Sequence, residues 1–282
     1  MEIMDGKKYR DELLDNYKRV ITENKYDIRL DIIFVGDNDA SRVYVRNKVK
    51  YCEEVGIKVV VHNLGGETSE NELISLIDEL NNNKEVTGII LQSPIPAHLD
   101  FKKCAEIINY KKDVDGFTNH NIDSLYHNEE AILPCTVKGI IKLLEHYDIK
   151  IEGANIVVIG RGEIVGKPLA LALENRNATV TLCHSKTKDL SHFTKDADII
   201  ISAIGKAKMI TSDMVSDGFI GVDVGINRDE DNKLCGDFDY ESINYKAKYI
   251  TPVPGGVGPM TIAMLIGNLI EMKGISNGQN IK

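Results

Sequence analysis

Short and almost wholly apolar runs alternate along the chain with segments of helical periodicity. After an amphipathic segment over roughly 6–25, apolar runs at 30–36, 57–64 and 87–92 each precede a segment with helical spacing. Strands that are apolar on both faces are typical of parallel sheets covered by helices on both sides. The pattern therefore predicts α/β architecture, with helices near 41–55, 69–82 and 101–109.

A second series of the same kind begins after a predicted helix near 137–147. A final helix, roughly 259–272, follows the Gly/Pro-rich loop PVPGGVGP. We expect two α/β domains, one over 1–145 and one over 146–255, with the C-terminal helix (about 256–282) packing back on the first. The predicted strands of the second series are NIVVIG (155–160), ATVTLCH (178–184), ADIIISAIG (197–205), GFIGVDVG (218–225) and KYIT (248–251).

Composition narrows the class of protein. The 282 residues are 43% hydrophobic and 27% charged, which are globular values. A formal net charge of −9 argues against a nucleic-acid partner. Five scattered cysteines without a CxxC spacing indicate reduced thiols in a cytoplasmic protein and no metal site. No secretory pattern or membrane-length apolar run is present, so we expect no membrane association.

A glycine turn follows the strand at 155–160. In NIVVIGRGEIVGKPLALAL, glycines at 160, 162 and 166 allow close approach of a phosphate, and the helix that follows favours negative charge at its N-terminus. The spacing is GxGxxxG, and Lys167 is followed by Pro168, so it is not a P-loop. The strand–turn–helix context favours a dinucleotide site over a plain tight turn.

The end of the next strand indicates which dinucleotide is bound. An NAD site usually places a carboxylate there, whereas this strand ends in His184, Ser185 and Lys186. Together with Arg161 in the glycine turn, a cation and a hydroxyl suit a 2′-phosphate. We therefore expect NADP rather than NAD, the alternative being that these are solvated loop residues.

The first half of the chain carries a Tyr/Lys pair. Tyr44 and Lys48 lie four positions apart on a predicted helix and therefore share a face. Gln92 ends the strand at 87–92, and Asp115 lies in the loop KKDVDGFT. Ligands of open α/β sheets gather at the carboxyl ends of strands, so all four residues are expected to face one crevice.

The position of Lys48 on its helix bears on its chemistry. Val45, Val49 and Cys52 form the apolar stripe, and Lys48 lies on the strip beside it, at the margin of the core. Burial disfavours the charged form of an amine, so this lysine is predicted to exchange protons near neutral pH. The alternative is a lysine that extends to solvent. Short-chain dehydrogenases also use a Tyr-xxx-Lys pair, but theirs follows the dinucleotide strand, whereas this pair precedes it.

Several sequence blocks, taken in order, resemble one family. With these blocks the chain resembles the methylenetetrahydrofolate dehydrogenase/methenyltetrahydrofolate cyclohydrolase family in its bifunctional bacterial form. The resemblance runs from about residue 4 to 270 and rests on the blocks VGDNDASRVYVRNK, GIILQSPIP, KDVDGFTNHN, PCTVKG, GRGEIVGKP, ATVTLCHSKT, VDVGINR, GDFDYE and TPVPGGVGPMTIAML.

The resemblance implies an N-terminal folate-binding catalytic domain, a Rossmann-type NADP-binding domain, a cleft between them and a homodimer. It implies NADP-dependent oxidation of 5,10-methylenetetrahydrofolate and hydrolysis of the methenyl product to 10-formyltetrahydrofolate. Lys48 would be the acid/base, ordered by Tyr44 and tuned by Gln92, and Asp115 would bind the pterin. The implied cofactor residues are Gly160, Arg161, Gly162, Ile164, Val165, Gly166, His184, Ser185 and Ile226, and the implied folate-side loop includes Gly255, Gly256 and Pro259.

The chain departs from the family pattern at the phosphate turn. The family usually has Gly-Arg-Ser, whereas this chain has Gly160-Arg161-Gly162. A hydrolase-only protein, with weak or absent dehydrogenase activity, is therefore an alternative. Other rivals are a different NADP oxidoreductase on a similar frame, such as a shikimate-type dehydrogenase, and a non-catalytic folate- or nucleotide-binding protein.

Overall fold

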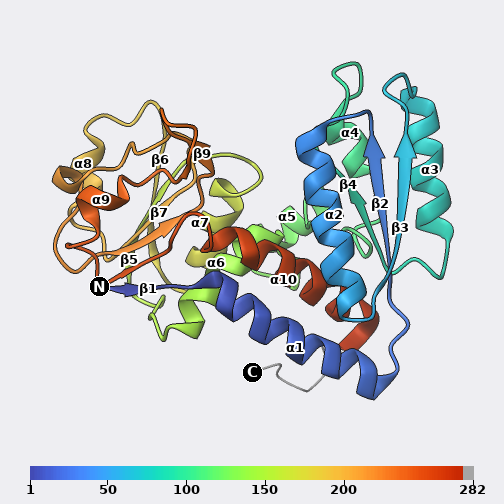
Figure 1. Cartoon of the computed structure of the whole chain (residues 1–282), viewed down its shortest axis with the longest axis horizontal. Coiled ribbons are helices and arrows are strands. Elements are labelled where there is room, and N and C mark those ends of the chain that lie inside the picture. Colours follow the sequence, from blue (N-terminus) through green and yellow to red (C-terminus); the bar gives the residue numbers. More distant parts are fainter. Residues whose placement is uncertain (276–282) are drawn as a thin grey trace. The chain divides into compact units, whose positions relative to one another are not determined.

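The apolar runs form the strands of two separate parallel sheets, each in its own α/β unit (Figure 1). The computed structural model describes residues 1–275. The three-stranded unit comprises Glu12–Cys135 and, among the described residues, Ile262–Ile275. The six-stranded unit comprises Met1–Asp11 and Thr136–Thr261.

In the three-stranded unit, β2 (Arg29–Val35) lies between β3 (Lys58–Leu64) and β4 (Gly88–Leu91). Both pairings are parallel, with Ile33 opposite His62 on one side and Leu91 on the other. Every residue of β2 after Arg29 is buried. This accounts for the unbroken apolar run in the sequence, because helices cover both faces of a central parallel strand.

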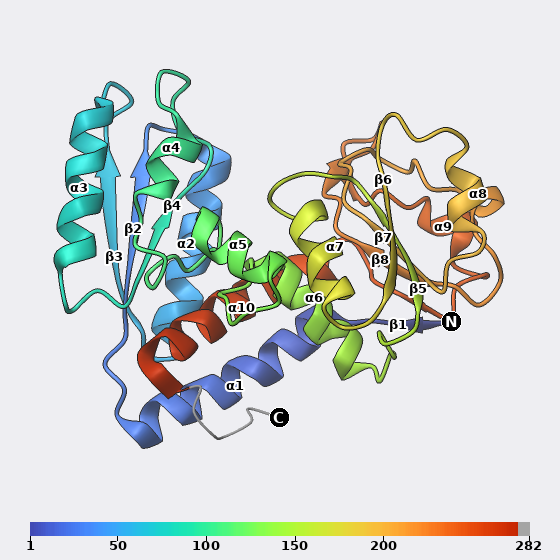
Figure 2. The ribbon, with the colours of Figure 1, turned by 180° about the vertical axis from the view of Figure 1, so that it is seen from behind.

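Helices of this unit pack on both faces of its sheet. On one face, α3 (Glu70–Asn82) and α4 (Phe101–Glu106) enclose a core that includes Ile33, Ile77 and Ile89. On the other face lies α2 (Asp39–Glu54), as Figure 2 shows. Its Arg42 guanidinium is 5.6 Å from the centre of the Phe34 ring of β2. The unit also contains α5 (Asn119–Tyr126), most of α1 (Gly6–Asn24) and of α10 (Val257–Ile270), and the π-helical turn η2 (Glu271–Ile275).

Side-chain caps determine where the helices of the three-stranded unit begin. Asn38 Oδ1 accepts a hydrogen bond from the Ser41 N–H at 2.9 Å at the start of α2. At the start of α3, Ser69 and Glu72 form a reciprocal capping box. Asp100 caps α4 through the Lys103 N–H. Each cap satisfies a backbone donor that the first helical turn leaves without an intrahelical partner.

The six-stranded sheet is wholly parallel and has the order β1-β11-β8-β7-β5-β6. The chain passes from β5 to β6 on one side and then returns to β7 on the other. The order of the strands therefore reverses at β5, which is where open α/β sheets bind ligands. The strands are β1 (Glu2–Ile3), β5 (Asn155–Ile159), β6 (Thr179–Cys183), β7 (Ile199–Ser202), β8 (Ile220–Asp223) and β11 (Tyr249–Ile250).

The remaining elements of this unit surround the sheet or extend from it. A short antiparallel hairpin, β9 (Asn227–Arg228) and β10 (Leu234–Cys235), follows β8. One face of the sheet is covered by a core that includes Phe219, Phe238 and Ile250. The helices are α6 (Cys135–His146), α7 (Gly166–Glu174), α8 (Leu190–Thr194), the 3-10 turn η1 (Ser212–Met214) and α9 (Tyr240–Ile243).

The structure confirms the predicted α/β class and the strands of both series. It also contains elements that the periodicity did not reveal, namely α5, the β9–β10 hairpin and the pairing of β1 with β11. These segments are two to eight residues long, too short for a period to be recognised. In the described part of the chain, no helix has the length and apolarity needed to cross a membrane.

Candidate active site and dinucleotide site

The centre of the lysine site is a hydrogen bond between Lys48 and Gln92. Lys48 is half-buried on α2, and its Nζ donates to Gln92 Oε1 at 3.1 Å. Gln92 follows β4 directly and is 8% exposed. Its Nε2 donates to the Ser93 carbonyl oxygen at 2.7 Å, which leaves the amide oxygen to face the lysine. The orientation of the Gln92 amide is therefore determined by both of its polar groups, the NH₂ group bound to Ser93 and the oxygen bound to Lys48.

Tyr44 lies one helical turn before Lys48 and exposes 53% of its surface. The apolar stripe predicted for this helix is present, because Val45 and Cys52 are buried beneath it. Burial raises the pKa of the Cys52 thiol to about 12, so this group remains neutral under the helix. The helix thus presents an open aromatic face beside the lysine amine.

Asp115 lies in a turn that follows a single bridge to β4. Residue Asp113 pairs in parallel with Ile89 of β4, and the Ile89 N–H donates to the Lys112 carbonyl at 2.7 Å. The chain then turns, because the Gly116 N–H donates to the Asp113 carbonyl at 3.2 Å, and Asp115 lies within this turn. The Cys135 thiol lies 3.8 Å from Asp115 Oδ1 as a weak donor. Lys48 and Gln92 thus meet at the carboxyl end of β4, Tyr44 lies one helical turn from Lys48, and Asp115 lies in the turn after the bridge to Ile89.

A buried carboxylate that sequence reasoning missed supports the Asp115 loop. Asp113 is 3% exposed and accepts hydrogen bonds from the N–H groups of Gly116 (3.0 Å) and Thr118 (2.7 Å) and from Asn121 Nδ2 (3.1 Å). Burial raises its pKa, while the bonds from Thr118 and Asn121 oppose that rise. The only signal in the sequence was a second aspartate in KKDVDGFT.

The glycine turn of the six-stranded unit contains two glycines that are sterically required and one that is not. Gly160 has φ +114°, and a Cβ atom there would lie 2.4 Å from the Ala203 carbonyl oxygen. A Cβ on Gly166 would lie 1.9 Å from the Gly160 carbonyl oxygen. Gly162 has no atom within 4 Å of its Cβ position. Gly160 and Gly166 thus close the turn against its neighbours, and Gly162 faces open space.

These features fit a dinucleotide. The turn leads into the N-terminus of α7, and no side chain caps that helix at Val165. Its first N–H groups are thus not capped by a protein side chain and suit a pyrophosphate. Arg161 and Ile164 are exposed on the turn, and Ile226, just after β8, exposes 56% of its surface. An exposed cation and two exposed aliphatic side chains suit a phosphorylated ribose and flat rings.

The loop after β6 holds His184 in one orientation. The ring Nδ1 of His184 accepts a hydrogen bond from the Lys186 backbone N–H at 3.1 Å. The backbone N–H of His184 donates to Thr187 Oγ1 at 2.9 Å. The neutral ring therefore carries its proton on Nε2. Ser185 is exposed beside it. A donor and a hydroxyl are thus present where the sequence predicted recognition of a 2′-phosphate.

The predicted folate-side loop lies in the six-stranded unit. Gly255 has φ +117°, and its carbonyl accepts a hydrogen bond from the Lys7 N–H at 2.9 Å. A Cβ on Gly256 would lie 2.7 Å from the Pro252 carbonyl oxygen. Pro259 lies in the first turn of α10, where a missing N–H has no cost. The loop is therefore closely packed against the start of α1.

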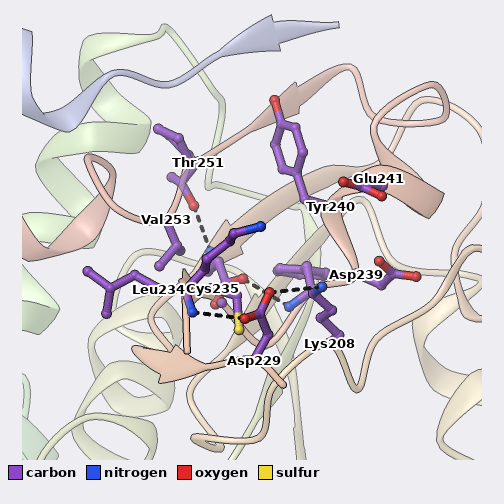
Figure 3. Close-up of a pocket in the computed structure, with 14 residues that line it drawn as sticks. Lys208, Asp229, Leu234, Cys235, Asp239, Tyr240, Glu241, Thr251 and Val253 are labelled. Carbon is purple, nitrogen blue, oxygen red and sulfur yellow. Dashed lines mark hydrogen bonds and ion pairs between the residues drawn. The ribbon is translucent and has the colours of Figure 1, made fainter. Parts of the chain in front are cut away.

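A pocket of about 260 Å³ lies elsewhere in the six-stranded unit (Figure 3). Lys208 and Asp229 pair at 3.4 Å on its wall, with Cys235 and Tyr240 nearby. Asp223 lines it too, and burial raises the pKa of this carboxyl to about 7. None of the predicted site residues lines this pocket.

Comparison with known proteins identifies the family. The family model for the catalytic domain of tetrahydrofolate dehydrogenase/cyclohydrolase matches residues 4–115, and that for its NAD(P)-binding domain matches 134–276. The chain belongs to this family. A bifunctional FolD protein of Agathobacter rectalis is 49% identical over 95% of this chain and 98% of its own, and one of Campylobacter hominis is 50% identical over 96% of each.

Solved structures agree with the family assignment. The FolD methylenetetrahydrofolate dehydrogenase/cyclohydrolase of Campylobacter jejuni has a TM-score of 0.95 at 46% identity, covering 98% of this chain and 99% of that one. The Trypanosoma brucei FolD, complexed with NADP and an inhibitor, has a TM-score of 0.90 at 30% identity, covering 97% of each chain. Shikimate dehydrogenase of Thermus thermophilus is 13% identical with a TM-score of 0.54, covering 88% of this chain and 94% of that one, which is a likeness of fold alone.

The contrast between the glycines of this FolD-family turn is testable. We expect Gly166→Ala to lower the free energy of unfolding by about 1–3 kcal/mol, because the added methyl overlaps the Gly160 carbonyl. Gly162→Ala is the matched control and should change stability by less than about 0.5 kcal/mol. Denaturant unfolding of both variants measures this, and equal losses at the two positions would contradict the steric assignment.

Proposed function

We propose that this chain catalyses both reactions of its family, with Lys48 as the acid/base of the hydrolytic step. It would oxidise 5,10-methylenetetrahydrofolate with NADP and hydrolyse the methenyl product to 10-formyltetrahydrofolate. The observation that carries the proposal is the Lys48 Nζ–Gln92 Oε1 hydrogen bond at the strand ends of the catalytic domain. The comparisons do not favour the hydrolase-only alternative, since the similar proteins of Agathobacter rectalis and Campylobacter jejuni are named as bifunctional.

The hydrolytic step needs proton transfers that one amine can perform. The methenyl group is an electrophilic cation, so water adds to its carbon without further activation. Lys48 Nζ then accepts a proton from the adduct and returns one to the departing ring nitrogen, and the second proton of the water is released to solvent as the formyl C=O forms. The bond from the carbon to that nitrogen breaks, and the formyl group stays on N10. General acid–base catalysis of this kind typically contributes about 10²–10⁴-fold in rate.

The neighbouring residues have supporting roles in the proposal. Gln92 holds the amine by a hydrogen bond from a buried position, and Tyr44 offers an exposed ring for stacking on the pterin. Asp115 is a half-buried carboxylate that can accept hydrogen bonds from the amino and N–H groups of the pterin.

The proposed dinucleotide site holds NADP by the glycine turn and the α7 N-terminus. When bound, NADP supplies the acceptor for the hydride that leaves the methylene carbon. The chain's task in that step is positioning. Arg161, His184 and Ser185 would contact the ribose phosphate, and Ile164, Val165 and Ile226 would contact the rings. The side chain missing at Gly162 leaves open space rather than a distorted turn.

We also propose that the protein is a cytoplasmic homodimer. All five cysteines are buried free thiols, which suits a reducing compartment. β6 is one of the two edge strands of the six-stranded sheet, β1 being the other. An open groove lined by Ala170, Leu171, Val180 and Leu182 runs beside it. Two copies pairing along β6 would cover this groove and complete the hydrogen bonds of the edge.

Lys48→Met should abolish cyclohydrolase activity, with a loss of at least about 100-fold, because the variant has no group to transfer the proton. Lys50→Met, an exposed change on the same helix, is the control and should retain the full rate. Decay of methenyltetrahydrofolate absorbance and reduction of NADP with methylenetetrahydrofolate are measured on the same preparations. Full hydrolytic rate in Lys48→Met would remove this residue from its role, and a native protein lacking either activity would refute the bifunctional proposal.

Asp115→Ala should raise the KM for folate substrates by about 10- to 100-fold, because hydrogen bonds to a charged group are lost. The KM for NADP should stay unchanged. Asp123→Ala, an exposed change on α5, serves as the control. Steady-state kinetics with each substrate varied in turn measure the effect. A folate KM equal to that of the native protein would contradict the pterin contact.

Val180→Asp should shift the protein toward monomer, because the introduced carboxylates face the groove that the second copy would cover. Val60→Asp is matched to it, since Val60 lies on β3, the edge strand of the other sheet. Sedimentation velocity over a range of protein concentrations distinguishes the two. A native protein that sediments as a monomer would refute the dimer, and a dimer unaffected by Val180→Asp would refute the β6 interface.

A further inference from the structure

Asp237 is a wholly buried carboxylate that the proposed reaction does not use. It lies between β10 and α9 and is 0% exposed. Its two oxygens accept five hydrogen bonds, all from neutral donors. Such a set is what a buried carboxylate needs in place of water. The position of its donors indicates what the group does.

Three of the donors are consecutive backbone N–H groups in the loop after β7. Asp237 Oδ2 accepts from Ile204 at 2.9 Å and from Gly205 at 3.4 Å, and Oδ1 accepts from Lys206 at 2.9 Å. A fourth donor, Ser202 Oγ at the end of β7, lies 2.9 Å from Oδ2. The carboxylate therefore gathers the loop around itself, as an anion does in a backbone nest.

The fifth donor belongs to the loop after β8. Asn227 Nδ2 donates to Asp237 Oδ1 at 2.9 Å. Asn227 directly follows Ile226, one of the predicted cofactor residues. In the same loop, a Cβ on Gly225 would lie 2.1 Å from Asp237 Oδ1, so only glycine lets the carboxylate approach. Asp237 thus joins the loops that follow two neighbouring strands.

Both loops adjoin the proposed dinucleotide site. The loop after β7 begins at Ala203, whose carbonyl excludes any side chain at Gly160 of the glycine turn. The strand order reverses beside β7, so these loops border the crevice where a dinucleotide binds. The Asp223 carboxylate in turn holds this part of the backbone, because it accepts hydrogen bonds from the N–H groups of Asp237 and Phe238 at 2.9 Å each.

We propose that Asp237 is a positioning residue for the dinucleotide. Its carboxylate holds the loops after β7 and β8 in the form that admits NADP, and it touches neither the cofactor nor folate. The inference rests on the proposed dinucleotide site. It predicts that NADP affinity depends on Asp237, while the hydrolytic chemistry at Lys48 in the other unit does not.

Asp237→Asn tests this with little change of shape. Each oxygen accepts from at least one backbone N–H, so the amide NH₂ must oppose one of them in either orientation. We expect the Kd for NADP, measured by isothermal titration calorimetry, to rise about 10- to 100-fold. Cyclohydrolase rate and folate KM should stay within about twofold of the native values. Asp217→Asn, an exposed change in the same unit, is the control.

A milder variant guards against loss of folding. Asn227→Ala removes a single donor and leaves the carboxylate with four, so the fold should persist while the loop after β8 is released. Its Kd for NADP should rise about 3- to 10-fold. If both variants fold and bind NADP as tightly as the native protein, or if cyclohydrolase activity falls in parallel with binding, the positioning role is refuted. A native protein that does not bind NADP would instead refute the underlying site.

Discussion

The hydrogen bond between Lys48 and Gln92 depends on two adjacent parallel strands ending at the same edge. The helix that carries Lys48 follows β2, and Gln92 follows β4. The Gln92 N–H donates to the Ile33 carbonyl at 2.9 Å, which extends the pairing of β4 with β2 by one residue. A shift of one residue in that register would turn the Gln92 side chain to the opposite face. The chemistry proposed for the lysine thus rests on sheet pairing. Because Gln92 Nε2 donates to the Ser93 carbonyl, the amide oxygen of Gln92 faces Lys48.

Buried carboxylates stabilise the loops at the strand ends, whereas apolar packing stabilises the sheets. Loops at strand ends carry backbone N–H groups that the sheet does not pair, and burying those groups without partners would cost free energy. Asp113 satisfies the N–H groups of Gly116 and Thr118 in the loop that carries Asp115. Asp237 does the same for the loop after β7. In both units a buried carboxylate outside the proposed chemistry thus holds loop backbone close to predicted binding residues: Asp113 beside Asp115, and Asp237, through Asn227, beside Ile226.

The glycines show how a sequence motif combines separate constraints. Gly160 and Gly166 are required because backbone carbonyls occupy the space of their side chains. At Gly162 no atom occupies the position of a side chain, so the turn itself would accept another residue there and the choice affects only the surface offered to a ligand. The departure from the family pattern at this position therefore removes a hydroxyl without disturbing the turn, and the fold gives no reason to separate this chain from bifunctional relatives.

The sequence by itself determined the α/β class, both series of strands, the glycine turn and the residues Tyr44, Lys48, Gln92 and Asp115 as a candidate group. It could do so because apolar runs, helical spacing and glycine turns are local properties that physical chemistry constrains residue by residue. Tertiary structure alone decided that β1 joins the sheet of the other half of the chain, and that Asp113 and Asp237 hold the loops. Those contacts join residues far apart in sequence. The sequence pattern around a loop aspartate is also the same whether the carboxylate is solvated or wholly buried. Only the packed chain shows which donors surround it.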